Sequence, residues 1–200
     1  MMRKILLVFL MCGFLVPGYG LANEWEASLS AGTDSVSGGI AYKKDLNTGY
    51  MKPGVSVLYT EDGNMEYKWA EFKFMVGSET LSPGLTCEVG LDGIFGDAED
   101  NGYSGDVGAL AFTGYVGYLF PKRVMPIPFE IFGGLTYSPE VLSFRDTEKY
   151  LSYRLGVGVR IIPNATVSLE YVDYDVDMED GPGEWNLDDD VIRLGLAMRF

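Results

Sequence analysis

The 200-residue chain contains no histidine. Histidine is the usual general base of hydrolases and acyltransferases, because its side chain titrates near neutral pH. A glycine-rich phosphate loop, a Cys/His metal motif and a nucleophile elbow are missing from the sequence as well. The sequence therefore predicts no catalytic residue, no cofactor and no metal site.

Cysteine and positive charge are also scarce. The two cysteines are Cys12 and Cys87, and 15 Lys and Arg stand against 29 Asp and Glu, for a formal net charge of −14. This charge disfavours nucleic acid as a partner, because nucleic acid is itself negative. Cys87 shares its strand face with apolar residues such as Val89, so we expect it to be a small apolar side chain rather than a reactive thiol.

Long apolar runs are confined to the amino terminus. Positive residues within 1–4, an apolar stretch at 5–16 and small residues at 20–22 are typical of a secretory signal peptide. We expect residues 1–22 to be removed and 23–200 to form one domain. A lipidated Cys12 is the alternative, although Met11 is not the small residue that such a cysteine follows. No later segment approaches the roughly 20 apolar residues of a membrane-spanning helix, so only strands could cross a bilayer.

The clearest pattern lies at the carboxyl end of the chain. Apolar residues at 192, 194, 196, 198 and 200 alternate with Arg193, Gly195, Ala197 and Arg199. A strand sends alternate side chains to opposite faces, so this segment has the apolar outside and polar inside of a membrane barrel. It resembles the assembly signal of Gram-negative outer-membrane proteins, which implies the barrel-assembly machinery as a partner. The candidate signal residues are Leu194, Leu196, Met198 and Phe200.

Alternation and turn residues together predict an antiparallel transmembrane β-barrel of about ten strands, with eight strands as the alternative. The expected strands are 24–31, 36–44, 53–61, 65–76, 84–95, 107–120, 126–137, 150–162, 165–176 and 189–200. An ordinary β-sandwich of a secreted protein is a further alternative, but it does not explain the terminal Phe200. The segment 67–74 does not alternate cleanly, and we expect a bulge there.

The expected connections differ between the two ends of the barrel. Compact turns at 121–123 and 163–164 contrast with long segments at 97–106, 138–149 and 177–190, as in outer-membrane barrels with long extracellular loops. An even number of strands returns both termini to the periplasm. The acidic segments 97–106 and 177–190 match no calcium-loop pattern, so we expect flexible, solvated loops. Weak bridging to lipopolysaccharide phosphates through divalent cations stays open.

Charged residues on the inward faces define the candidate site. Glu130, Arg154, Arg160, Glu170 and Arg193 are expected to face the lumen and to form a hydrogen-bonded ion network, since buried charges require partners. Glu88 and Asp92 are expected to face inward too. A barrel of about ten strands is narrow, whereas aqueous porins use roughly 16 or more, so the interior should be largely plugged.

One motif resembles a known family. Residues 135–144, with the sequence Leu-Thr-Tyr-Ser-Pro-Glu-Val-Leu-Ser-Phe, precede a strand at 150–159 and an Ile-Pro-Asn turn at 162–164. This arrangement is similar to the YfaZ family of bacterial outer-membrane proteins, most clearly over 107–200. Val141 stands where the family has a smaller residue. The resemblance implies a signal-bearing outer-membrane barrel and supplies no catalytic residues.

Three functional hypotheses follow. The first is a non-enzymatic, monomeric barrel of the outer membrane, surrounded by lipid and lipopolysaccharide, with a structural or surface-interaction role. The second is a narrow, porin-like channel for small solutes, lined by Arg154, Arg160 and Glu170. The third and least favoured is a surface hydrolase that uses only carboxylates at the rim, such as Asp189.

Overall fold

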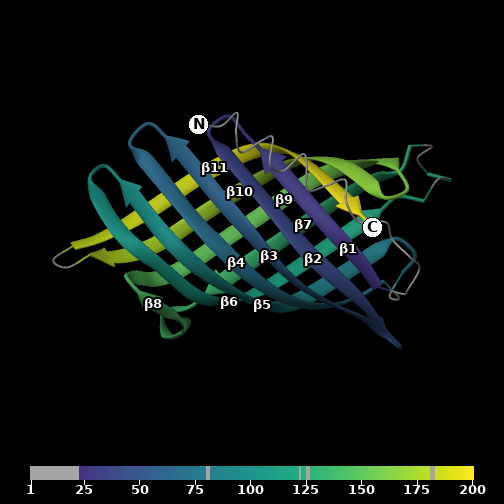
Figure 1. Cartoon of the computed structure of the whole chain (residues 1–200), viewed down its shortest axis with the longest axis horizontal. Coiled ribbons are helices and arrows are strands. Elements are labelled where there is room, and N and C mark those ends of the chain that lie inside the picture. Colours follow the sequence, from purple (N-terminus) through teal and green to yellow (C-terminus); the bar gives the residue numbers. More distant parts are fainter. Residues whose placement is uncertain (1–22, 80–81, 122, 125–126, 181–182) are drawn as a thin grey trace.

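The computed structural model describes residues 23–79, 82–121, 123–124, 127–180 and 183–200. The expected signal peptide and Cys12 lie outside these residues. The described chain is one antiparallel sheet closed into a barrel (Figure 1). Among the described residues, no helix is long and apolar enough to cross a membrane.

Ten long strands form the wall in the described part of the chain, which confirms the predicted strand number. They are β1 (Asn23–Ala31), β2 (Ser35–Leu46), β3 (Gly49–Asp62), β4 (Met65–Ser78), β5 (Leu85–Asp100), β6 (Tyr103–Leu119), β7 (Phe129–Ser138), β9 (Thr147–Ile162), β10 (Ala165–Asp180) and β11 (Gly183–Arg199). A short helix η1 (Glu140–Leu142) and a short strand β8 (Ser143–Arg145) lie between β7 and β9.

Each long strand pairs with the next along the chain, and β1 closes the barrel against β11. We call the end that carries the start of β1 and the end of β11 the terminal end, and the opposite end the distal end. In Figure 1 the distal hairpins β5–β6 and β10–β11 lie at the left and the terminal end at the right.

The predicted bulge in the fourth strand is wrong. β4 pairs with β3 and β5 without any register shift, and its side chains alternate regularly. Trp69, Glu71 and Lys73 face inward, whereas Phe72 and Phe74 face outward. The sequence pattern was misleading because charged and aromatic residues occupy both faces of this strand.

The two acidic segments expected as loops are strands. β5 and β6 continue to a tight hairpin at Asn101 and Gly102, whose φ angles of 50° and 89° suit a two-residue turn. β10 and β11 likewise pair as far as Asp180 and Gly183. Backbone pairing continues because alternate side chains there still pack inside the barrel. The third expected loop segment, 138–149, contains η1 and β8.

An apolar belt surrounds the barrel. On β11, Ile192 and Leu194 are 63% and 62% exposed, whereas Arg193 between them is 2% exposed. This confirms the predicted sidedness of that strand. We define the belt by its outward residues Val55, Val57, Phe72, Phe74, Val89, Leu91, Phe95, Leu110, Phe112, Val116, Ile131, Leu135, Tyr137, Leu155, Val157, Leu169, Ile192, Leu194 and Leu196.

Candidate functional site in the barrel interior

The interior has two layers. The layer nearer the terminal end, which we call the charged layer, contains Glu26, Lys52, Glu71, Lys73, Glu88, Asp92, Arg154, Glu170 and Arg199. The layer nearer the distal end, which we call the distal core, contains Leu58, Tyr67, Trp69, Ile94, Ala98, Val107, Ala109, Ala111, Tyr150, Val172, Tyr174, Val176, Met178 and Leu187. Arg193 lies beneath the distal core, within reach of Tyr174.

One group of the charged layer lies close to the start of β1 and the end of β11. Lys52 Nζ lies 3.1 Å from Glu26 Oε1 and 3.7 Å from Glu88 Oε1. Arg199 Nε donates to Glu26 Oε2 at 3.1 Å, and the Tyr50 hydroxyl donates to Glu88 Oε1 at 2.7 Å. Each carboxylate thus has a cationic partner, as buried charges require.

A second group lies deeper, below the distal core. Lys73 Nζ lies 2.6 Å from Glu71 Oε2 and 3.6 Å from Asp92 Oδ2. The hydroxyl of Ser56 donates to Glu71 at 2.6 Å. Asp92 is completely buried, and neither of its oxygens has a hydrogen-bond partner among the described residues. Glu88 and Asp92 therefore face inward, as predicted from the alternation of this strand.

The five residues of the expected ion network all face inward, but the structure brings only some of them together. Arg154 Nε lies 4.0 Å from Glu170 Oε2, and Ser168 donates to Glu170 at 2.8 Å. Within the described chain, neither Glu130 nor Arg160 has an ion pair within 4.0 Å. The Glu130 side chain lies against Gly158 instead.

Arg193 is held by hydroxyl groups rather than by a carboxylate. Its Nε donates to Ser35 Oγ at 3.0 Å and its guanidinium to the Tyr174 hydroxyl at 3.1 Å. Ser35 lies on β2, two strands away around the barrel from β11. A contact of this kind depends on how far the strands are staggered, which the alternation of a single strand does not specify.

Sequence reasoning missed four charged residues of this layer: Glu26, Lys52, Glu71 and Lys73. For Glu71 and Lys73, the alternating apolar residues Phe72, Phe74 and Val76 of β4 could have indicated the inward orientation. Apolar residues at 72, 74 and 76 imply that the alternating residues Glu71 and Lys73 point inward.

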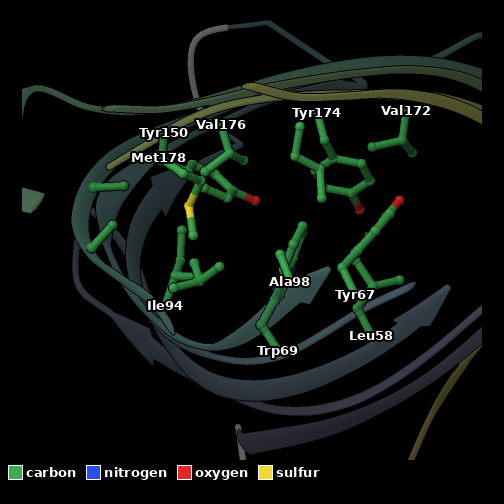
Figure 2. Close-up of a cluster of buried hydrophobic side chains, with 14 residues drawn as sticks. Leu58, Tyr67, Trp69, Ile94, Ala98, Tyr150, Val172, Tyr174, Val176 and Met178 are labelled. Atoms are coloured by element: carbon green, nitrogen blue, oxygen red, sulfur yellow. The ribbon is translucent and has the colours of Figure 1, made fainter. Parts of the chain in front are cut away.

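Aromatic rings from opposite walls meet in the distal core (Figure 2). The Trp69 ring stacks on Tyr67 with centroids 4.6 Å apart, and it meets Tyr174 and Tyr150 edge-on at 5.2 and 5.9 Å. Such offset and edge-on pairs are favourable beyond the area they bury. The indole Nε1 of Trp69 and the hydroxyl of Tyr150 have no hydrogen-bond partner among the described residues.

Asp189, the example of a rim carboxylate, is turned toward this core. The Tyr67 hydroxyl donates to Asp189 Oδ2 at 2.5 Å. Partial burial raises the pKa of Asp189, and the hydrogen bond from Tyr67 opposes that shift. The described residues contain no group of three or more His, Cys, Asp or Glu side chains arranged to hold a metal ion.

The fold and the sidedness define a class: a membrane barrel whose outside is apolar and whose interior is charged next to the belt. A family model described as "Outer membrane protein beta-barrel domain" matches residues 27–200. The chain therefore belongs to the outer-membrane β-barrel family, and the protein is integral to the bacterial outer membrane. None of the curated proteins matches this chain.

Several solved structures are similar to this chain. The NanC porin is 11% identical with a TM-score of 0.45, covering 88% of this chain and 99% of that chain. Neisserial surface protein A is 11% identical with a TM-score of 0.37, covering 89% and 94%. The N-terminal β-barrel domain of Pseudomonas aeruginosa OprF is 11% identical with a TM-score of 0.35, covering 91% and 100%.

Proposed function

We propose that the protein is a non-enzymatic barrel of the outer membrane whose interior is closed, and that it acts in envelope integrity or as a surface-interaction protein. The observation that carries this proposal is the distal core. Trp69 on β4 contacts Tyr150 on β9 and Tyr174 on β10, so side chains meet across the barrel. A layer of fully buried apolar side chains offers hydrated ions no polar path.

The charged layer supports the same proposal. Lys52, Lys73 and Arg199 each contact carboxylates directly, so their charges are compensated within the wall. Opposite charges in mutual contact hold the strands together, and removing one partner leaves a buried charge uncompensated. This arrangement suits a structural lumen better than one that selects a permeating ion.

The absence of an enzymatic activity is part of the proposal. The chain has no histidine. Asp189 is bound to Tyr67, and an acid-only mechanism would require a second carboxylate at a defined separation from it.

Conductance of the purified, folded protein in planar bilayers tests the closed interior. We expect no reproducible unitary conductance from the unmodified protein. A Trp69→Ala, Tyr174→Ala double variant removes two rings from the distal core and should show unitary steps. The matched control, Phe72→Ala, removes a ring from the outer face and should stay silent. Regular steps in the unmodified protein would overturn the proposal.

A narrow channel for small solutes is the second candidate, and the charged layer is the observation that favours it. Arg154, Arg160 and Glu170 would line its path. If the unmodified protein conducts, Glu170→Gln should change the preference between cations and anions. A conducting protein with unchanged selectivity would remove these residues from the path.

The proposed partners follow from the belt and the carboxyl terminus. We propose that the protein is a monomer that contacts lipid and lipopolysaccharide, and that the barrel-assembly machinery recognises Leu194, Leu196, Met198 and Phe200. The motif at 135–144 supports membership of the YfaZ family. Removal of Phe200 should lower the amount of folded, heat-modifiable protein in outer membranes, and an unchanged amount would contradict the proposed signal.

A further inference from the structure

The barrel wall is interrupted between β7 and β9. After Ser138 the chain leaves the wall, forms η1 and returns as β8 along the edge of β6. Figure 1 shows this segment standing out from the wall beside β8. Pro139 explains the departure, because proline has no N–H group to continue the ladder. We call residues 139–142 the wall excursion.

Hydrogen bonds hold the wall excursion in one conformation. The Pro139 carbonyl accepts from Leu142 N at 2.9 Å and from Ser143 N at 3.2 Å. At its base, Ser138 Oγ donates to the Leu110 carbonyl at 3.1 Å and lies 3.1 Å from Ser143 Oγ. The residues on either side of the excursion, Ser138 and Ser143, are thus both held against β6.

This ordered segment presents an apolar side chain outward. Val141 is 87% exposed, the largest value for any large hydrophobic side chain among the described residues. An isolated exposed valine is ordinary on a protein surface. The position of Val141 relative to the belt decides whether its side chain contacts lipid.

The wall excursion is continuous with the belt on both sides. Tyr137 precedes it and Phe144 follows it, and both are 40% exposed. The Phe144 ring covers the outer face of Gly108, where a Cβ atom would lie 2.6 Å from the ring. Phe144 continues the belt through Phe95, with ring centroids 5.6 Å apart.

The distal edge of the belt lies at the same level. On the outer face, Phe95 is followed toward the distal end by Asp97, which pairs with Lys68 at 3.3 Å. Beside Phe144, Arg145 pairs with Asp106 at 3.4 Å. These exposed ion pairs belong in water or among headgroups, so the excursion leaves the wall where hydrocarbon ends.

We propose that the wall excursion is a lipid anchor: Val141 inserts among the acyl chains at the edge of the leaflet that surrounds the distal end. The occupant of this surface is lipid hydrocarbon, because the excursion extends an apolar face that already meets lipid. The N–H groups of Leu142 and Ser143 are already paired within the segment, which lowers the cost of bringing it next to hydrocarbon.

Spin labelling in lipid vesicles tests the anchor. A nitroxide is attached to Val141→Cys in a Cys87→Ala background, and the folded protein is placed in phosphatidylcholine vesicles. Collision rates with oxygen, which concentrates in acyl chains, and with a water-soluble nickel chelate are compared. Leu194→Cys is the lipid control and Asn186→Cys the water control.

We expect the ratio of oxygen to nickel collisions at residue 141 to be several-fold higher than at 186 and close to that at 194. A ratio equal to that at 186 would overturn the proposal, because it would place residue 141 in water. Magnetic broadening between labels at 141, lost on dilution with unlabelled protein, would overturn it in favour of a second copy. Conductance plays no part in this measurement, so its outcome is independent of the closed interior.

Discussion

The terminal and distal halves of the barrel wall are built from the same strands with opposite polarity. On β10, Ser168 and Glu170 face inward while Leu169 faces outward. Farther along, Tyr174 faces inward while Asp175 faces outward. The pairing of β10 with β9 has no register shift between residues 166 and 177. The phase of the strand is therefore constant, and only the chemistry of its faces changes.

This difference shows what surrounds each half. Next to lipid, apolar side chains point outward and the interior carries the charges. The interior becomes an ordinary hydrophobic core beside the distal part of the belt, where Ile94 and Ala111 lie next to Phe95 and Phe112, and this core continues past the lipid, where water is outside. The hairpins that extend past the belt receive no stabilisation from lipid. Burial of apolar side chains in the distal core must therefore stabilise them. Four substitutions test this comparison, each by urea unfolding of the vesicle-inserted protein.

The largest effect is expected in the distal core. Trp69→Ala removes a fully packed ring and should lower the free energy of unfolding by about 3–5 kcal/mol, because the cavity cannot be filled by lipid. Phe72→Ala on the outer face of the same strand is the control and should cost much less. Equal losses would mean that the distal layer is not a packed core.

The next effect is expected in the charged layer. Lys73→Met leaves Glu71 and Asp92 without their shared cation and should cost about 3–5 kcal/mol. Lys68→Met breaks the exposed pair with Asp97 and should cost between 0 and about 1 kcal/mol. If the two variants are equally stable, the charged layer is hydrated enough to screen its charges.

A cation on the belt should have a slightly smaller effect. Leu194→Arg places a charge among acyl chains and should cost about 2–4 kcal/mol if residue 194 lies near the bilayer midplane. Asn186→Arg, on the same face of β11 near the distal end, adds the same charge beside Asp175 and Asp177 and should be close to neutral. A neutral Leu194→Arg would contradict the position of the belt.

The smallest effect concerns the distal outer face. Asp190 lies directly across the hairpin from Asp173, and like charges in this position repel. Asp190→Asn should therefore stabilise the protein by about 0.2–1 kcal/mol at low salt. The gain should shrink at high salt, because exposed charges are screened. A gain that does not depend on salt would point to a cause other than repulsion.

Much of this architecture was predictable because apolar and polar side chains alternate along most strands. Ile192, Leu194 and Leu196 alternate with Arg193 and Gly195, so the sidedness of β11 required no tertiary information. The alternation of β9 likewise placed Arg154 in the interior. Prediction failed for β4, where Lys68 and Lys73 lie on opposite faces and no single face is apolar throughout.

The distal hairpins show why the remaining prediction failed. The segments 97–106 and 177–190 are acidic, and acidic segments usually form loops. Here the acidic residues alternate with Ala98, Val176 and Met178, which form a core only together with residues of other strands such as Tyr67 and Trp69. Strand formation thus depended on partners from distant parts of the chain.

By itself, the sequence determined a membrane barrel of about ten strands, its lipid-facing side and an interior with charges of both signs, because side-chain alternation and turn residues are local properties. The tertiary structure decided which charges pair, where the polarity of the wall reverses and how far the strands extend. Arg193 meets Ser35, and Tyr67 meets Asp189, only because barrel closure and strand stagger bring distant strands together.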